Sequence, residues 1–425
     1  MALTDAQIAI VKSTAPVLKE HGNTITTVFY NNLISENKGL SNVFNVTSQT
    51  TGRQPRALAG AVLAYATYID DLPKLAHAVE RIAHKHVSLQ VTPAQYDVVG
   101  KYLIQAIGQV LGDAATPEIV DAWTAAYGVL AGVFINREGE MYKANAAEHW
   151  VGWRKFKITK KAAESSNITS FYLAPSDGGE ARLPKYLPGQ YVSVQVFVPE
   201  LGYLQSRQYS MSQAPRAEGD YYRVSVKREE GEDVGIKGLV SNLLHANFNE
   251  GDEVEVSHPQ GEFFADPEDK TKDGVPAVLI SVSSGATPMM SILESLVATQ
   301  GAVAPAIKRP VSWIHSSRSL ATQPFDEAVR HICRDNEHVS ANIFLRTDGS
   351  DGSVDGLSYH YGDTRLDIGK LDKDRDLFLN DPRSEYFICG PEQFMIDVRR
   401  ALLALGVDKA RISMELFSTG DVADE

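Results

Sequence analysis

Apolar residues recur every three or four positions through the first third of the chain, which predicts an all-helical region over residues 1–148. One helix is expected from Asp5 to about Glu20 with Thr4 as its N-cap, and a second is expected after Gly22. Thr-Pro pairs at Thr92 and Thr116 predict the starts of two later helices, because threonine can cap a helix and proline is tolerated in its first turn.

From Arg154 onward the period of the pattern changes to two. Apolar and polar residues alternate in several short runs, and the clearest is Val192 to Val198, in which four valines alternate with Ser193, Gln195 and Phe197. Proline and glycine separate the runs. Short alternating strands with frequent turns predict a small antiparallel β-barrel over residues 149–268.

The last third begins with a continuous apolar run, Ala277 to Val282, which is typical of a buried parallel strand. Further strands are expected at Val311–His315, Val339–Leu345, Tyr386–Ile388 and Arg411–Leu416, with helical segments between them. This alternation predicts an α/β domain over residues 269–425, with an open parallel sheet that binds a nucleotide at its carboxyl edge.

Composition narrows the functional classes. The chain has 425 residues, which fits about three domains of about 150 residues each. Its net charge of −13 and lack of Lys/Arg clusters argue against binding nucleic acid or anionic membrane. Two cysteines offer no disulfide framework, and no signal peptide or transmembrane segment is expected, so the predicted location is cytoplasmic.

One helical stripe carries candidate chemistry. Leu75, Val79, Ile82 and His86 are spaced four, three and four apart, so all four share one face of a helix. A histidine on an apolar face is commonly a core residue bonded to a carbonyl. The alternative is an axial ligand of an iron porphyrin, since a neutral imidazole on such a face can hold haem iron.

Several motifs in the helical region closely resemble the globin domain of flavohaemoglobins. They are Phe29-Tyr30, Phe44-Asn45, Gln54-Pro55-Arg56-Ala57-Leu58, Lys85-His86, Tyr96 and Phe134-Ile135-Asn136-Arg137-Glu138. The resemblance implies haem b, with His86 as the iron ligand and Lys85 beside it. It implies that Tyr30, Gln54 and Leu58 close the distal pocket and that Phe44 packs on the porphyrin edge.

The same resemblance implies a proximal relay of His86, Tyr96 and Glu138. A phenol and a carboxylate near the imidazole would fix its orientation and raise its basicity, which oxygen activation needs and oxygen storage does not. The alternatives are a core tyrosine at Tyr30, a surface amide at Gln54 and a solvated Glu138. Because Pro55 belongs in the first turn of a helix, Gln54 is expected at the cap.

In the barrel region, Arg207-Gln208-Tyr209-Ser210 resembles the flavin-binding signature of the ferredoxin–NADP reductase family. The resemblance implies that Arg207 binds the FAD pyrophosphate, that Tyr209 faces the flavin and that Ser210 lies near the ring nitrogen that accepts hydride. Gly238-Leu239-Val240-Ser241 resembles the phosphate turn of the family. Tyr191 is expected at the adenosine or the flavin edge, and the connection from Glu229 to Lys237 looks longer than usual.

In the α/β region, Ser283-Ser284-Gly285-Ala286-Thr287-Pro288 partly matches the Gly-x-Gly-x-Thr-Pro turn of that family, with Ser283 in place of the first glycine. Thr287 is expected to cap the following helix, whose N-terminus suits a pyrophosphate. Cys389-Gly390-Pro391 is a second match, and Glu415-Leu416-Phe417-Ser418 is a third. The resemblance implies that Phe417 covers the flavin and that Glu415 tunes electron transfer; the alternative for Phe417 is a terminal aromatic in the core.

The choice of nicotinamide depends on the turn after the strand that ends at His315. Ser317 and Arg318 could accept the 2′-phosphate of NADPH, and no acidic residue directly follows this strand to repel it. NADH is therefore expected to work and NADPH to be tolerated. The alternative is a solvent-facing arginine in a polar turn.

Together these expectations describe a chain in which a flavin splits the electron pair of NAD(P)H for a haem. Flavohaemoglobins use this wiring to convert nitric oxide and oxygen to nitrate, so the resemblance implies a nitric oxide dioxygenase. Two alternatives stay open: reduction of another acceptor such as an alkyl hydroperoxide, and a redox-coupled oxygen sensor. A lipid is a candidate second occupant of the distal pocket.

Overall fold

A computed structural model describes residues 2–148, 150–178, 183–231, 235–297, 308–347, 349–354, 356–363, 365–417 and 420. Contacts within it divide the chain into two units. The first comprises Met1–Trp153 with the strand segment Gln195–Arg207. The second comprises Arg154–Val194 and Gln208–Phe417, and it holds most of the barrel together with the α/β region.

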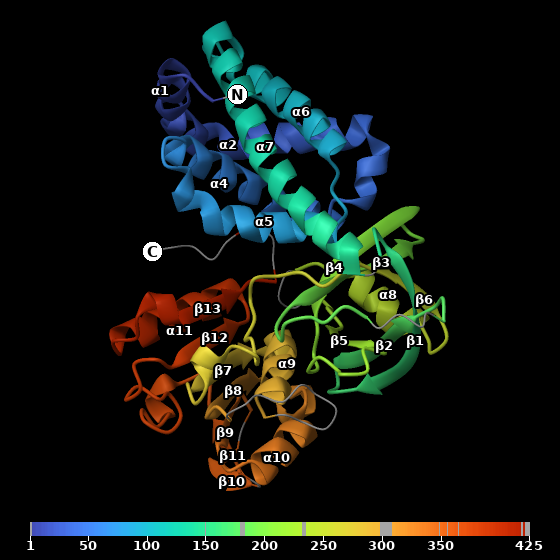
Figure 1. Cartoon of the computed structure of the whole chain (residues 1–425), viewed down its shortest axis with the longest axis vertical. Coiled ribbons are helices and arrows are strands. Elements are labelled where there is room, and N and C mark those ends of the chain that lie inside the picture. Colours follow the sequence, from blue (N-terminus) through green and yellow to red (C-terminus); the bar gives the residue numbers. More distant parts are fainter. Residues whose placement is uncertain are drawn as a thin grey trace. The chain divides into compact units, whose positions relative to one another are not determined.

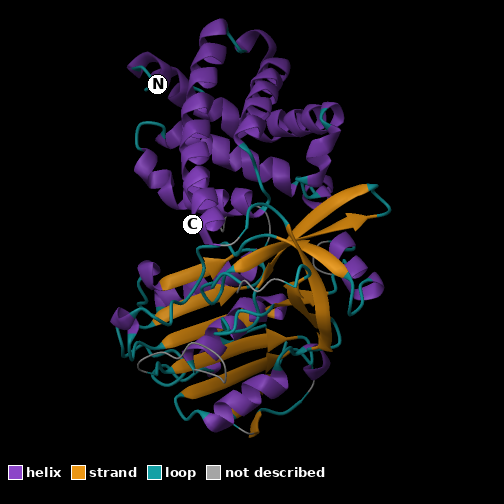
Figure 2. Cartoon of the chain, turned by 45° about the vertical axis from the view of Figure 1, so that its right-hand side comes forward, coloured by secondary structure: helices purple, strands orange, loops and turns teal. Residues whose placement is uncertain are grey.

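The first 148 residues are helical, which confirms the expected class (Figures 1 and 2). The α-helices are α1 Asp5–Ser13, α2 Ala15–Glu36, α3 Val46–Thr50, α4 Arg53–Tyr68, α5 Ala76–Ser88, α6 Pro93–Leu111 and α7 Pro117–Glu148. Short 3₁₀ turns lie at η1 Lys38–Asn42, η2 Leu72–Leu75 and η3 Gly112–Ala114. Capping boxes begin α1 at Thr4 and α6 at Thr92, as their sequences predict.

The expected boundary at Gly22 is wrong. The break lies at Thr14, and α2 runs from Ala15 through Gly22 to Glu36. Pro16 sits in the first turn of α2, where its missing N–H costs nothing. Gly22 lies inside α2, where an added Cβ would make an ordinary contact of 3.5 Å with the Cβ of Ala59 on α4.

In the described residues the barrel has six strands: β1 Arg154–Ala163, β2 Ile168–Pro175, β3 Tyr191–Val198, β4 Tyr203–Ser210, β5 Tyr222–Lys227 and β6 Glu253–Val256. Their order is β4-β3-β6-β1-β2-β5. An antiparallel bridge between Met211 and Val224 joins the two outer strands and closes the sheet. This confirms the antiparallel barrel, and one helix, α8 Leu239–Asn247, accompanies it.

The α/β region contains a seven-stranded sheet in the order β10-β11-β9-β8-β7-β12-β13 (Figure 2). Its strands are β7 Ala277–Val282, β8 Val311–Ser317, β9 Val339–Leu345, β10 Gly352–Val354, β11 Leu357–Tyr361, β12 Glu385–Cys389 and β13 Ile412–Glu415. Its helices are α9 Ala286–Leu296, α10 Asp326–Asp335 and α11 Glu392–Ala404, and its 3₁₀ turns are η4 Lys270–Lys272, η5 Ser283–Gly285, η6 Leu320–Thr322, η7 Ile368–Lys370 and η8 Lys409–Arg411.

All strand pairs from β11 to β13 are parallel, as expected, and β10 pairs antiparallel with β11 at the edge. The sequence pattern does not reveal β10, whose residues are all exposed. Apolar side chains cover both faces of the sheet. In β7, for example, Ala277 and Leu279 join the core cluster that contains α9 and α10, whereas Val278 and Ile280 join the cluster that contains α11.

Among the described residues, one helix is long and apolar enough to cross a membrane by length and composition alone, the segment Pro117–Ala147 of α7. A single helix of this kind is weak evidence for a membrane span, because the core helix of a globular protein passes the same test. Several α7 side chains are buried in the helical unit, including Trp123, Phe134 and Met141. The helix also carries the buried carboxylate of Glu138, which belongs to the polar cluster described next.

Candidate functional site

Three polar side chains, one each from α5, α6 and α7, meet in the helical unit. The Nδ1 of His86 (α5) lies 2.8 Å from the Oε1 of Glu138 (α7) and 2.8 Å from the hydroxyl of Tyr96 (α6). The Tyr96 hydroxyl donates to the same Glu138 oxygen at 2.5 Å. The Glu138 carboxylate is 3 % exposed, so it is not the solvated residue of the alternative interpretation.

This arrangement selects one form of the imidazole. A carboxylate can only accept, so the proton of His86 is assigned to Nδ1 and the lone pair to Nε2. Burial and the adjacent Glu138 raise the pKa of Tyr96, which keeps its phenol protonated. Within the described chain the Nε2 atom has no hydrogen-bond partner, although the His86 side chain is only 32 % exposed. It is available to a metal ion.

A second polar pair lies across the helical unit. Gln54 of α4 donates from Nε2 to the hydroxyl of Tyr30 on α2 at 3.2 Å. Because this hydroxyl accepts from Gln54, its own hydrogen remains for a ligand. Burial raises the pKa of Tyr30, so the group stays a donor at neutral pH. The ring of Phe44 packs edge-on against Tyr30, with centroids 5.4 Å apart.

The first turn of α4 differs from the expectation. The helix begins at Arg53 with Gly52 as its N-cap at φ +68°, so Gln54 lies inside the first turn rather than at the cap. Pro55 follows it there without cost because the first turn needs no intrahelical N–H donor. Gln54 and Leu58 are then one helical turn apart on α4.

The helical unit fits a flat apolar group. Its buried side chains form two clusters, one with Tyr30 and α2, α4 and α6, the other with Tyr96, Phe134 and α5. Apolar side chains packed on the two clusters are left only partly buried, among them Phe44, Leu58, Leu75, Val79 and Ile82. Haem between the clusters would cover this apolar surface and offer iron to the Nε2 of His86.

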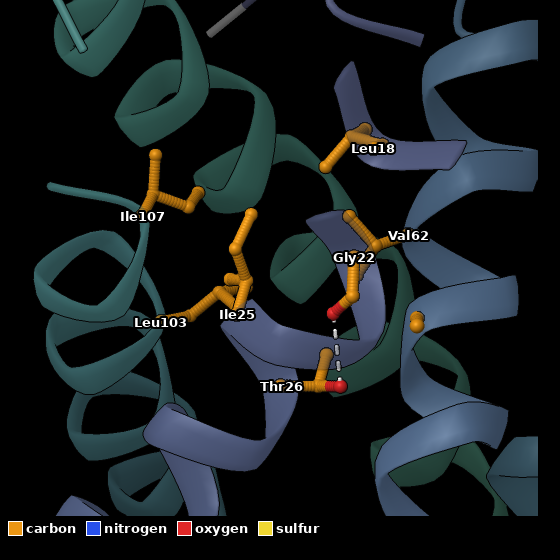
Figure 3. Close-up of a pocket in the computed structure, with 8 residues that line it drawn as sticks. Leu18, Gly22, Ile25, Thr26, Val62, Leu103 and Ile107 are labelled. Carbon is orange, nitrogen blue, oxygen red and sulfur yellow. Dashed lines mark hydrogen bonds between the residues drawn. The ribbon is translucent and has the colours of Figure 1, made fainter. Parts of the chain in front are cut away.

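A small apolar cavity lies between α2, α4 and α6 (Figure 3). The figure shows Ile25, Val62 and Leu103 around it, and the Thr26 hydroxyl turned to the carbonyl of Gly22. Thr26 also donates to the carbonyl of Pro55 at 2.8 Å. Thr26 precedes Tyr30 by one turn of α2, so the cavity extends the same face of that helix.

The flavin-type motif lies at the end of β4. Arg207 and Gln208 are half-buried and Ser210 is buried at the strand end, next to the bridge that closes the barrel. Gln208 donates to the hydroxyl of Ser193 at 3.0 Å. The polar side chains of this motif thus come from one strand.

The Gly-x-x-Ser turn begins α8, with Gly238 as its N-cap. A Cβ at Gly238 would lie 2.6 Å from the Oγ of Ser241 and 2.9 Å from the Cβ of Glu229, so a larger residue there would require these side chains to shift. Val240 is buried in the first turn. Tyr191 begins β3, where its ring would meet a Cβ added at Gly261 at 3.1 Å. Part of the connection from Glu229 to Lys237, residues 232–234, lies outside the described residues.

The sequence did not reveal Gln205, two residues before this motif. Its side chain is 1 % exposed, and its Nε2 donates to the carbonyls of Ser41 and Phe44 at 2.9 and 3.1 Å. Its Oε1 accepts from the Val46 N–H at 3.1 Å. All four groups belong to the first unit, so this amide fixes the loop that carries Phe44. A polar residue in an alternating strand gives no sequence signal of such a role.

The predicted nicotinamide residues share the carboxyl edge of the seven-stranded sheet. Strand register pairs Cys389 with Ser281 on one side and with Glu415 on the other, so the turns after β7, β12 and β13 begin side by side. A Cβ at Gly285 would come within 2.1 Å of the Cys389 carbonyl, and one at Gly390 within 2.5 Å of Val282. These turns fit together only because both residues are glycines.

Ser283 occupies the position where the related motif has glycine, and its φ is +56°. A side chain is disfavoured in this left-handed conformation, which explains the usual glycine. Thr287 does not cap α9: the helix begins at Ala286, and the Thr287 hydroxyl donates to the carbonyl of Ser284 at 2.9 Å. Pro288 is also inside the first turn.

At the end of β8, His315 is fully buried between two serines. Its Nδ1 lies 2.7 Å from the Oγ of Ser281 and its Nε2 lies 3.1 Å from the Oγ of Ser317. Burial lowers the pKa of His315 to about 3, so the ring is neutral. Arg318, which follows Ser317 directly, is exposed. Ser317 is thus engaged in the interior, while Arg318 faces solvent.

At the C-terminus, Leu416 packs partly buried on the α11 side of the sheet and Phe417 is 49 % exposed. The alternative in which Phe417 is tucked into the core is therefore wrong. Ser418 lies outside the described residues. An exposed aromatic side chain at the carboxyl edge leaves a ring face available to a cofactor.

Comparisons with known proteins agree with this division. A globin family model matches residues 27–134, and a model of the oxidoreductase FAD-binding domain matches residues 155–264. The chain is 46 % identical to the flavohemoprotein of Bordetella pertussis and 41 % identical to that of Chromobacterium violaceum, in both cases with 98 % of each chain covered.

Two solved structures extend the comparison. A flavohemoglobin from Malassezia yamatoensis with bound FAD and heme aligns with a TM-score of 0.80 at 28 % identity, covering 98 % of this chain and all of that one. The FAD/NAD-binding domain of a nitric oxide dioxygenase from Vibrio cholerae aligns with a TM-score of 0.50 at 33 % identity, covering 62 % of this chain and 97 % of that one.

Proposed function

Because this chain belongs to the flavohaemoglobin family, we propose that it is an NAD(P)H-dependent nitric oxide dioxygenase. The chain combines a globin with an FAD- and nicotinamide-binding reductase, and its cofactors are haem, FAD and NAD(P)H. The proposed reaction consumes two nitric oxide, two oxygen and one NAD(P)H, and gives two nitrate, NAD(P)⁺ and one proton. When bound, the cofactors split the hydride pair into single electrons and bind oxygen at iron.

The observation that carries the proposal is the contact of His86 with a buried carboxylate. Glu138 accepts one hydrogen bond from the Nδ1 of His86 and another from the Tyr96 hydroxyl. A histidine that donates to a carboxylate is a stronger electron donor at its other nitrogen. This property serves the activation of oxygen, whereas a storage globin does not need it.

On the other side, the Tyr30 hydroxyl would orient the ligand. Its raised pKa keeps the proton in place, and the Gln54 amide turns the hydroxyl hydrogen away from itself. A single donor at this position can stabilise a ligand that carries partial negative charge. Tyr30 and Gln54 are therefore proposed to hold oxygen for reaction with nitric oxide.

Stopped-flow mixing of the reduced, oxygenated protein with nitric oxide tests the proposal. Nitrate is expected in proportion to the nitric oxide consumed, with one NAD(P)H oxidised for two nitrate formed. Nitric oxide consumption without nitrate would exclude a dioxygenase. Faster NADH oxidation with an alkyl hydroperoxide than with nitric oxide would favour reduction of that acceptor instead.

The nicotinamide choice and the setting are also proposals. The exposed Arg318 suits the 2′-phosphate of NADPH, and we expect NADH to work as well; steady-state kinetics of wild type and Arg318→Ala with both cofactors test this. Equal losses for both would exclude recognition of the phosphate.

A cytoplasmic location would supply NAD(P)H. We also propose that a lipid can bind against the partly buried distal side chains and compete with oxygen. Solvent extraction followed by mass spectrometry would detect such a lipid.

A further inference from the structure

One helix of the α/β region is tied by polar contacts to the segment that follows the flavin motif. On α9, Ser291 donates from Oγ to the carbonyl of Gln213 at 2.6 Å. One turn later, the Oε2 of Glu294 accepts from the N–H of Ala214 at 2.9 Å. Both contacts lie within the second unit.

The other oxygen of Glu294 holds a buried cation. Arg223 of β5 donates from Nη2 to Glu294 Oε1 at 3.1 Å, and the two side chains are 12 % and 13 % exposed. The same Nη2 also donates to the Ser212 carbonyl, and the guanidinium lies over the ring of Phe325. Arg223 and Glu294 therefore clamp residues 212–214 from two sides. Each residue of this segment is thus held by a hydrogen bond to a side chain outside it.

The clamp lies close in sequence to both candidate cofactor subsites. Residues 212–214 begin two residues after Ser210, the end of the flavin motif. Glu294 lies six residues after Pro288, in the helix whose first turn forms the candidate pyrophosphate site. Tyr186 donates to the same Gln213 carbonyl at 2.6 Å, so this carbonyl accepts two side-chain hydrogen bonds.

We infer that Glu294 is a positioning residue for hydride transfer, acting through residues 212–214 to set the distance between the bound nicotinamide and the flavin. The inference rests on the NAD(P)H-to-FAD half of the proposed function and does not involve nitric oxide. Donor and acceptor must meet within a narrow range of distance, and a misplacement of about 1 Å can cost about 100-fold in rate. In this role neither Glu294 nor its partner Arg223 touches a cofactor.

Two substitutions separate reach from charge. Glu294→Asp keeps the carboxylate but shortens the side chain by one carbon–carbon bond, about 1.5 Å. Glu294→Gln keeps the length and an oxygen acceptor for the Ala214 N–H but removes the charge. If reach positions the segment, Asp should slow flavin reduction about 10- to 100-fold at saturating NADH, while Gln should retain most of the wild-type rate.

The measurement is anaerobic stopped-flow reduction of FAD in the holoprotein, without nitric oxide. Two further readouts do not depend on turnover: the charge-transfer absorbance of the NAD⁺ complex of the reduced flavin, and the visible circular dichroism of the oxidised flavin. Both should change in Glu294→Asp and stay near wild type in Glu294→Gln. FAD content and the haem spectrum should be unchanged in both.

Glu385→Gln is the matched control. Glu385 is the first residue of β12 and lies at the amino ends of the strands, opposite the carboxyl edge. It is 21 % exposed and binds Arg309 at 2.6 Å and also Lys272. Its loss should lower the melting temperature and leave the limiting rate of flavin reduction and the charge-transfer band unchanged. The inference is overturned if Glu294→Asp loses stability like this control but keeps the wild-type rate and band, or if Gln and Asp slow the reaction equally.

Discussion

The Oε1 of Glu138 lies 2.8 Å from the Nδ1 of His86, although the two residues are 52 positions apart in the chain. The carboxylate reaches the imidazole from the middle of α7, where it is almost completely buried and also accepts the Tyr96 hydroxyl. Burying a charged group without partners costs several kcal/mol, so its two donors are needed to keep it there.

Replacing Glu138 with Gln should weaken the donation from His86 to bound iron. The amide is a poorer acceptor than a carboxylate, so the iron–histidine stretching frequency in the resonance Raman spectrum of the ferrous protein should fall. Nitric oxide turnover should drop about 10- to 100-fold. Haem content serves as the control, and an unchanged stretching frequency at full haem content would contradict the role assigned to Glu138.

Replacing Tyr30 with Phe should speed oxygen release. The substitution removes one hydrogen bond to a ligand with partial negative charge, worth about 1.5–3 kcal/mol, so the off-rate should rise about 10- to 150-fold. Flash photolysis or stopped-flow displacement by carbon monoxide measures it. An off-rate close to wild type would mean that Tyr30 does not face the ligand. Tyr65→Phe is the comparison variant, because the Tyr65 hydroxyl bonds the Ala126 carbonyl instead.

Ser283→Gly should stabilise the reductase part. Ser283 adopts φ +56°, a conformation that costs an L-residue roughly 1–2 kcal/mol and costs glycine little, although glycine gives part of this gain back as unfolded-state entropy. Denaturant unfolding should show a net gain of about 0.5–1 kcal/mol. Ser284→Gly, at a neighbouring residue with negative φ, should have the opposite sign; a loss in both variants would contradict the strain.

Gly22→Ala and Gly100→Ala should act in opposite directions in the helical unit. At Gly22 the new methyl group would make an ordinary contact of 3.5 Å with Ala59, so better helix propensity should add about 0.5–1 kcal/mol to the free energy of unfolding. At Gly100 it would lie 2.4 Å from the Tyr127 ring, which a hydrogen bond to the Tyr96 carbonyl holds in place. Overpacking there should cost about 1–3 kcal/mol. Thermal unfolding of both variants tests the pair, and equal signs would contradict it.

His315 should make the reductase part sensitive to acid. Its pKa is about 3 in the folded protein and about 6.5 when unfolded. Below about pH 6.5 the unfolded chain therefore takes up a proton that the folded protein does not, and stability falls by about 1.4 kcal/mol per pH unit until the pH nears 3.

The test compares the pH dependence of unfolding in wild type and His315→Asn between about pH 6.5 and 4. Other groups titrate in both proteins, so the difference between the two slopes isolates His315. The variant should show a slope smaller by about one proton. Identical slopes would mean that His315 is protonated in the folded state.

The sequence determined much of this molecule because the information is local. Hydrophobic periods of 3.6 and 2 predicted the helical, barrel and α/β regions, and threonine with a following proline placed the starts of α6 and α7. Motifs of four to six consecutive residues pointed to the flavin and nicotinamide turns. Neighbours in sequence are neighbours in space, so their joint geometry follows from backbone rules.

Tertiary structure decided what depends on distant segments. The chain breaks at Thr14 and not at Gly22, which stays inside α2. The buried amide of Gln205 has a role only because it meets the loop of Phe44. Glu294 reads as an ordinary helix surface residue until β5 brings Arg223 against it. No periodicity records which side chains from separate elements share one dry space. The value of a charge or an amide is set there by its burial and its partners, and packing alone supplies both.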